Sequence, residues 1–190
     1  MTLSEMNLFL LDVDPRKNAS FHFDKHCVKM ILELAQMLYC AHWLCGITDW
    51  GILHRGDTGT DPYRKTHINH PTSKWVRSHP GNYLYTAILG LELCYEYTRR
   101  YGREHKTQLR LEWLLVHLPN CVEQDFPGFL ATRDIPTGCT PMPLAMPEQY
   151  HQTSAVASYR AYYLGEKRQI QDKIRTADWL AVQWQLSFSQ

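Results

Sequence analysis

Apolar and polar positions along this 190-residue chain follow helical spacing over most of its length. The strongest stripe of apolar side chains lies between Asp24 and Leu44, at Val28, Ile31, Leu32, Ala35, Leu38 and Tyr39. Asp24 is a suitable N-cap residue, and Gly46 is a residue type that commonly ends a helix. The pattern therefore predicts one long helix over residues 24–44.

The same reading predicts further helices over residues 83–101, 106–118, 153–174 and 176–186. Between them, residues 46–73 and 119–147 are rich in turn residues and are expected to form long loops. Residues 7–11 are a short apolar run that could be a strand or one buried turn, and residues 18–20 are expected to be loop. We expect an all-α fold, with residues 1–190 forming a single helical domain of four to five helices.

Composition places the chain among ordinary globular proteins, with 44% hydrophobic and 21% charged residues. No apolar stretch approaches the roughly 18 residues of a membrane span, and the N-terminus lacks a signal-peptide pattern. The six cysteines form no CxxC pair, so we expect reduced cysteines in a cytoplasmic protein that binds no membrane. Nothing in the pattern requires a cofactor or a metal.

Positive charge is concentrated in one part of the chain, although the net charge is only +1. Residues 64–110 hold nine Lys or Arg against three carboxylates, and the remainder of the chain is acidic. A local basic zone suits a phosphate-bearing partner. The alternative is a solvated, Arg-rich helix surface.

The first candidate site lies on the 24–44 helix. His26, Lys29 and Glu33 are spaced by three and four residues, so their side chains project from one face. A carboxylate and a base aligned in this way can share a cleft and transfer protons. The alternative is a solvated stripe that carries a Lys–Glu pair.

A second group lies between Asn69 and Arg77, where polar donors, cations and an aromatic ring occur together. His70, Lys74 and Arg77 could hold phosphates while Trp75 stacks on a base. Thr72 or Ser73 could also be the N-cap of a helix that begins here.

A third group, Tyr159, Arg160 and Tyr162, could form either core or a substrate wall. A metal site is a further alternative, because His22 and His26 are four residues apart and His67 and His70 lie near each other in sequence.

The order of these features resembles the phage pyrimidine-dimer DNA glycosylases of the endonuclease V type. The matching positions are Asn7-Leu8, then Asp24-Lys25-His26 with Glu33 seven positions after the histidine, then Pro71-Thr72, Ser78-His79, the helix end Arg99-Arg100-Tyr101-Gly102, and Pro147-Glu148-Gln149-Tyr150 with Trp179 or Trp184.

The resemblance implies an all-helical enzyme in which an amine attacks the sugar C1′ of a nucleotide while Glu33 assists. In that family the amine is the N-terminus after removal of Met, which here would be Thr2. His26 and Lys29 would orient Glu33 and a phosphate. Lys74, Arg77, Arg99 and Arg100 would hold pyrimidine-containing DNA, with Trp75, Tyr159 and Tyr162 against a displaced base.

Two other functions remain open at this stage. The chain could be a transferase that modifies a pyrimidine in phage DNA or in a free nucleotide, again with Glu33 as base. It could also be a nucleic-acid-binding protein without enzymatic activity that uses the basic segment alone.

Overall fold

The computed structural model describes residues 7–47, 49–122 and 135–167. Over these ranges the chain is helical and contains no strand, which confirms the all-α fold class. The elements in chain order are α1 (Pro15–Ser20), α2 (Asp24–Leu44), α3 (Gly51–Thr58), α4 (Pro71–Ser78), α5 (Pro80–Tyr101), α6 (Gln108–Val116), a 3₁₀ turn (Glu148–Tyr150), α7 (Ala155–Tyr162) and a π-helical turn (Tyr163–Lys167). The described residues thus hold more helices than the four to five expected.

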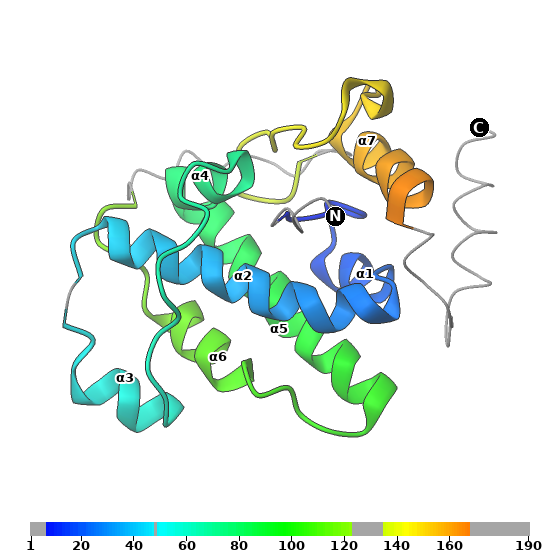
Figure 1. Ribbon diagram of the computed structural model, residues 1–190. Coiled ribbons are helices and arrows are strands. Elements are labelled where there is room, and N and C mark those ends of the chain that lie inside the picture. The colour runs from blue at the N-terminus through cyan, green and yellow to red at the C-terminus, as the bar shows by residue number, and fades with distance from the viewer. Residues whose placement is uncertain (1–6, 48, 123–134, 168–190) are drawn as a thin grey trace.

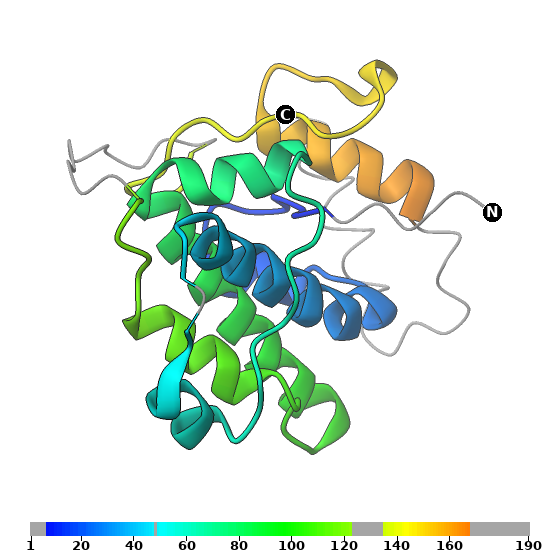
Figure 2. The same ribbon diagram turned by 60° about the vertical axis from the view of Figure 1, so that its left-hand side comes forward.

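Helices α2 and α5 form the central pair of the fold. Helices α1, α4 and α6 all pack on α5, and α4 and α6 also contact α2. Figures 1 and 2 show residues 7–11 running between α2 and α7, with α3 at the opposite end of α2. The core therefore surrounds α2 on several sides.

Residues 7–11 thread through this core as extended chain and pair with no strand among the described residues. Leu8, Leu10 and Leu11 are fully buried, and Phe9 is 4% exposed. Because both sides of the segment are covered, its sequence is an unbroken apolar run without the alternation of a half-exposed strand. Neither the strand nor the single buried turn expected from sequence is what forms.

Two short helices, α1 and α3, occupy segments that the sequence pattern assigned to loops, and a third, α4, begins close to the expected cap at Thr72 or Ser73. Helix α1 includes residues 18–20, and it begins where Asp14 accepts hydrogen bonds from the Arg16 and Lys17 amides. Helices α3 and α4 both begin inside the predicted 46–73 loop. Eight or fewer residues give too few turns for a clear apolar stripe, so tertiary packing decides these helices.

The long helices were predicted with small errors at their ends. Helix α2 has the predicted bounds, although Phe23 rather than Asp24 is its N-cap residue. Helix α5 begins at Pro80, three residues earlier than predicted, because proline fits a first turn and the His79 side chain caps the Gly81 amide. Helix α6 is shorter than predicted at both ends.

The predicted 153–174 helix changes geometry partway. Its α-helical part ends at Tyr162 and a π-helical turn follows. Gly165 in this turn touches Tyr150, since a Cβ at this position would lie 2.7 Å from a Tyr150 ring carbon. Residues 168–174 and the predicted 176–186 helix lie outside the described residues.

Cysteine pairing departs from the expectation of reduced thiols. Cys45, at the end of α2, forms a disulfide with Cys121, which follows α6. The other four cysteines are free and buried. The two cysteines are 76 residues apart in sequence, so no short spacing motif could predict the disulfide. Only the packing of α2 beside α6 brings the two positions together.

Among the described ranges, no helix combines the length and apolarity that a bilayer crossing requires.

Arg100, predicted to hold DNA, instead joins α5 to α2 inside the protein. Its side chain is 1% exposed. The guanidinium donates to Glu96 at 2.5 Å and to Asp24 at 3.0 Å, and also to the backbone carbonyls of Ser20 and His22. Every one of these acceptors lies within the protein, so the expected phosphate contact of Arg100 is wrong.

Loss of this guanidinium should destabilise the fold strongly. Arg100→Met would leave Glu96 and Asp24 without their shared buried cation, which costs about 3–5 kcal/mol in comparable sites. Urea unfolding followed by circular dichroism measures the change.

Arg99→Met is the matched control, because Arg99 pairs with the same Glu96 but its side chain is 61% exposed. It should cost no more than about 1 kcal/mol. Equal losses for the two variants would contradict the structural role of Arg100.

Candidate active site

Glu33 lies where three distant parts of the chain meet. It is 6% exposed, and its Oε1 is 2.8 Å from the Lys29 Nζ one turn away on α2. Its Oε2 accepts the Asn7 backbone N–H at 3.3 Å. The Asn7 side chain in turn donates to the Ala145 carbonyl at 3.0 Å. Both carboxylate oxygens therefore have donors, and the carboxylate is held in one orientation.

Lys29 connects this carboxylate with the surface. Its side chain is 41% exposed, whereas that of Glu33 is 8% exposed. The predicted alignment of His26, Lys29 and Glu33 on one face is present, and in that stripe Lys29 is the residue that solvent reaches. A partner that binds at the surface could thus contact the Lys29 amine first and Glu33 behind it.

His26 is a buried neutral ring in this arrangement. Its Nδ1 lies 2.9 Å from the Tyr163 hydroxyl, and the ring stacks on Phe9 with centroids 5.3 Å apart. Burial, with smaller contributions from the nearby His22, Lys29 and Lys167, lowers the pKa of His26 to about 3. His26 therefore positions its neighbours by packing and hydrogen bonding, and carries no charge for a phosphate at neutral pH.

The aromatic residues predicted to stack on a base are mostly core residues. Trp75 is 5% exposed and donates its indole N–H to the Thr140 carbonyl. Tyr159 is fully buried and donates to the Pro143 carbonyl. Tyr162 is 8% exposed, with the Lys167 amine 4.8 Å above its ring. The core alternative is correct for Tyr159, and the Trp75 ring is likewise covered by surrounding chain.

Arg160 also contacts the protein itself. It donates to the Leu11 carbonyl at 2.7 Å and pairs with Asp12 at 3.2 Å, so it fastens α7 to the N-terminal segment. Arg99 is exposed beside Glu96 at the end of α5. Neither of these arginines contacts the residues around Glu33 in any described interaction.

The predicted group at the start of α4 divides into capping and surface residues. His70 is the N-cap, since its ring accepts from the Thr72 amide, and the expected caps Thr72 and Ser73 are both buried. Lys74 is exposed, and Arg77 is half-buried.

Two cations that the sequence reading did not single out adjoin this helix. Arg64 and Lys65 are exposed on the segment that leads to α4, and this segment crosses the surface of α2 in Figures 1 and 2. Residues 62–91 contain no Asp or Glu. The missing carboxylates were visible in the sequence, but the position of the segment across α2 was not.

Asn7, Tyr163 and Lys167 are further residues of this region that sequence reasoning did not propose as site residues. Asn7 and Tyr163 act through contacts across 26 and 137 residues of chain, which leave no local pattern. Thr2, the predicted amine, lies outside the described residues.

The histidine alternative for a metal finds no support in the described ranges. No group of three or more His, Cys, Asp or Glu there is placed to hold a metal ion. His22 instead faces the Asn18 carbonyl at 2.8 Å through its Nδ1.

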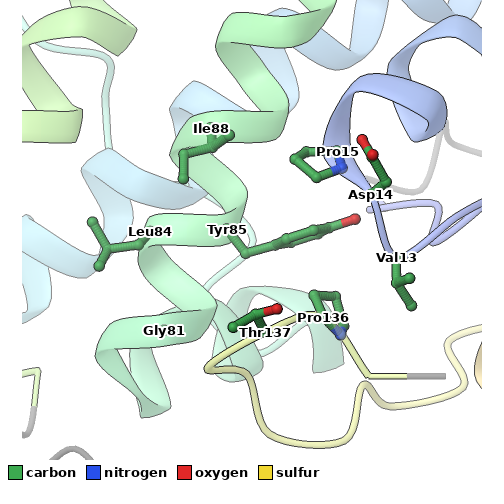
Figure 3. A pocket seen from close by; sticks show the side chains of 9 residues that line it. All are labelled: Val13, Asp14, Pro15, Gly81, Leu84, Tyr85, Ile88, Pro136 and Thr137. Atoms are coloured by element: carbon green, nitrogen blue, oxygen red, sulfur yellow. The ribbon is translucent and has the colours of Figure 1, made fainter. Parts of the chain in front are cut away.

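A separate cavity of about 530 Å³ lies between the start of α1 and α5 (Figure 3). Its walls are mainly apolar, with Leu84, Tyr85 and Ile88 along α5. The carboxylate at its edge, Asp14, is engaged as the cap of α1. The region around Glu33 therefore remains the stronger candidate for proton-transfer chemistry.

Comparisons with family models, with curated protein sequences and with solved structures gave no match for this chain. The resemblance to pyrimidine-dimer glycosylases accordingly stays a prediction.

Three buried histidines make stability depend on pH. The pKa is about 4 for His22, about 3 for His26 and about 4 for His42, and burial is the main cause in each case. In the unfolded chain they protonate near pH 6.5. The unfolded state therefore binds more protons at acidic pH, and the free energy of unfolding should fall as pH drops from 7 toward 4.5.

Urea unfolding at a series of pH values measures this slope, to which each such histidine adds at most about 1.4 kcal/mol per pH unit. His42→Gln should reduce the dependence of the unfolding free energy on pH and leave the contacts of Glu33 unchanged. A slope that His42→Gln leaves unchanged would contradict the assignment.

Proposed function

We propose that the chain is a nucleic-acid-base-directed enzyme in which Glu33 is the catalytic carboxylate. The observation that carries the proposal is the contact of a buried, doubly tethered Glu33 with the half-exposed amine of Lys29. A carboxylate in contact with an amine can accept a proton from that amine as it attacks an electrophile.

In the glycosylase reaction, a neutral amine attacks C1′ of the nucleotide and the bond from C1′ to the base breaks. The base leaves with the bonding electron pair and takes up a proton. The attached amine loses one proton, the C1′–O4′ bond then breaks as O4′ takes up a proton, and the nitrogen becomes an iminium on the opened sugar. Glu33 would accept a proton from the amine at a distance of 2.8 Å.

Two amines are candidates for this attack. The Lys29 amine already contacts Glu33. The Thr2 amine would have to reach the same carboxylate from five residues before Asn7, a stretch of at most about 18 Å when extended. The Asn7 peptide N–H occupies the second carboxylate oxygen, so the geometry favours Lys29 as the attacking amine.

The cationic surface of Arg64, Lys65 and Lys74 supports a nucleic-acid partner. The three side chains are exposed, and residues 62–91 around them carry no carboxylate. Such a surface attracts phosphates without sequence preference and positions a strand across α2.

The burial of Trp75, Tyr159 and Tyr162 favours a second candidate, the pyrimidine-modifying transferase. A glycosylase that extrudes a base from a duplex needs rings to receive it. A transferase acting on a free nucleotide or a single strand needs only a base catalyst near an exposed reactive group. Glu33 would then deprotonate the incoming nucleophile.

Borohydride trapping on DNA with an abasic site or a thymine dimer tests the proposal. We expect the wild-type protein to form a covalent adduct, and Glu33→Gln to reduce trapping by at least about 100-fold, the usual contribution of a general base. Peptide mapping should find the adduct on Lys29.

Glu112→Gln is the control, because Glu112 is a half-buried carboxylate on α6 that accepts a hydrogen bond from Gln108 on the same helix. An adduct on Thr2 would assign the amine differently and retain the class. No adduct together with Glu33-dependent turnover of a nucleotide would favour the transferase, and DNA binding without any Glu33-dependent chemistry would refute both enzymes.

DNA affinity should depend on the cationic surface and on salt. Replacement of Arg64, Lys65 and Lys74 by Ala should weaken binding and reduce the slope of log affinity against log salt by roughly 2 to 3, since each phosphate that a cation neutralises adds about 0.9 to the slope. Fluorescence anisotropy with a labelled oligonucleotide measures both.

Arg55→Ala is the matched control, since Arg55 is 73% exposed but pairs with Asp61. A triple variant with the wild-type slope would place the nucleic acid elsewhere.

A further inference from the structure

A second cleft, of about 840 Å³, lies between the end of α2, helix α3 and the segment that follows α3. It is lined by aromatic rings and charged groups together: Trp43, Asp49, Trp50, His54, Arg55 and Asp61. Glu33 and Trp43 are ten residues apart on α2, which is about 15 Å along the helix axis. The cleft is therefore separate from the Glu33 region. Figure 1 shows α3 at one end of α2.

The aromatic walls of this cleft are fixed by contacts behind them. The rings of Trp43 and Trp50 meet edge to face with centroids 5.0 Å apart, and Trp50 meets His54 at 5.4 Å. Trp43 donates its indole N–H to the Tyr63 carbonyl, and the His54 Nε2 lies 2.8 Å from the Tyr39 hydroxyl. A flat ligand would thus meet a Trp43 ring that is already in place, which lowers the entropic cost of binding.

Two buried polar atoms of these walls, Trp50 Nε1 and His54 Nδ1, have no hydrogen-bond partner among the described residues. Trp113 Nε1 is also buried without a hydrogen-bond partner among the described residues. The centroids of the Trp113 and His54 rings are 4.7 Å apart. A buried donor left unpaired costs about 1–3 kcal/mol, so such atoms are uncommon in a fold. An indole N–H can only donate, so its partner would have to be an acceptor such as a carbonyl oxygen.

The charges around the cleft disfavour an anionic ligand. Asp49 and Asp61 line the cleft, and Asp57 lies on α3. Against these three carboxylates stand Arg55, which pairs with Asp61 at 2.5 Å, and Arg110, which donates to the Asp61 carbonyl at 3.2 Å. Burial lowers the pKa of His54, so its ring adds no positive charge at neutral pH. A phosphate would meet more negative than positive charge here.

We propose that this cleft binds an uncharged planar nitrogen heterocycle bearing carbonyl groups, such as the base of a free nucleoside. The ring would lie against Trp43 and Trp50. Trp50 Nε1 is buried, so the Trp50 ring would shift to let its N–H donate to a ligand carbonyl oxygen. The site is independent of the proposed chemistry at Glu33. Its ligand would be a small molecule that binds in addition to a nucleic acid held on the cationic surface.

Titration of the full chain with thymidine, followed by calorimetry and by the indole N–H signals in NMR spectra, tests this site. We expect saturable binding and a shift of the Trp50 indole signal. Thymidine 5′-monophosphate should bind more weakly than thymidine because of its charge. Trp50→Phe keeps a stacking ring but removes the N–H, and should lower affinity about five- to tenfold, the worth of one neutral hydrogen bond.

Two substitutions separate this proposal from its competitors. Asp49→Asn keeps an oxygen that can cap the Gly51 amide but removes the charge, so it should leave thymidine affinity unchanged. Glu33→Gln should also leave it unchanged, which makes failure here distinguishable from failure of the catalytic proposal. Asp57→Asn, on the same helix but outside the lining residues, is the surface control.

Several outcomes would overturn the proposal. These are no saturation by thymidine up to its solubility limit, a Trp50→Phe variant with wild-type affinity, or tighter binding of choline that Asp49→Asn abolishes, which would identify a cation site. Tighter binding of methyl glucoside would identify a sugar site. If Trp50→Phe fails to fold, an unchanged Trp50 indole signal in the wild-type protein on addition of thymidine would overturn it equally.

Discussion

The burial of helix α2 is the constraint on which the rest of the structure depends. Fourteen of its twenty-one residues are buried, so polar groups that would normally face water must find partners inside the protein. The Asp24 carboxylate accepts a hydrogen bond from Arg100. The His26 ring is hydrogen-bonded to the Tyr163 hydroxyl, and the His42 ring to the Tyr83 hydroxyl. Arg100 and Tyr83 come from the two ends of α5, and Tyr163 comes from the π-helical turn after α7, so satisfying α2 also fixes how these elements pack on it.

The same constraint shapes the region around Glu33. Its carboxylate is buried on a helix face that the N-terminal segment covers, and the Asn7 amide satisfies one of its oxygens. Asn7 is held in turn by the Ala145 carbonyl, and Phe9 stacks on His26 two turns away from Glu33. Residues that hold the fold together thus also hold the candidate catalytic group, and an error in their packing would displace it.

Helix α2 also links two regions of different character. Toward its middle lies Glu33 with Lys29, and at its far end lies an aromatic cluster with carboxylates around it. The Cys45–Cys121 disulfide joins that end of α2 to the segment after α6. Helix α2 therefore carries the Glu33–Lys29 contact and the aromatic cleft at separate positions along its length.

The sequence determined those features that depend on local spacing. The apolar period over residues 24–44 predicted α2 with its observed bounds, and the intervals of three and four residues placed His26, Lys29 and Glu33 on one face. Helical geometry alone fixes which side chains share a face, so no knowledge of the rest of the molecule was needed. The all-α class followed from the same periodicity.

Only the tertiary structure decided which faces are buried and which residues are partners. Arg100 and Trp75 had the residue types of a nucleic-acid surface, yet both are enclosed by other elements. Packing between distant segments produces both the Cys45–Cys121 disulfide and the hydrogen bond from the Asn7 amide to Glu33. A residue's type and its local period say nothing about what covers it, because burial is set by helices far away in sequence.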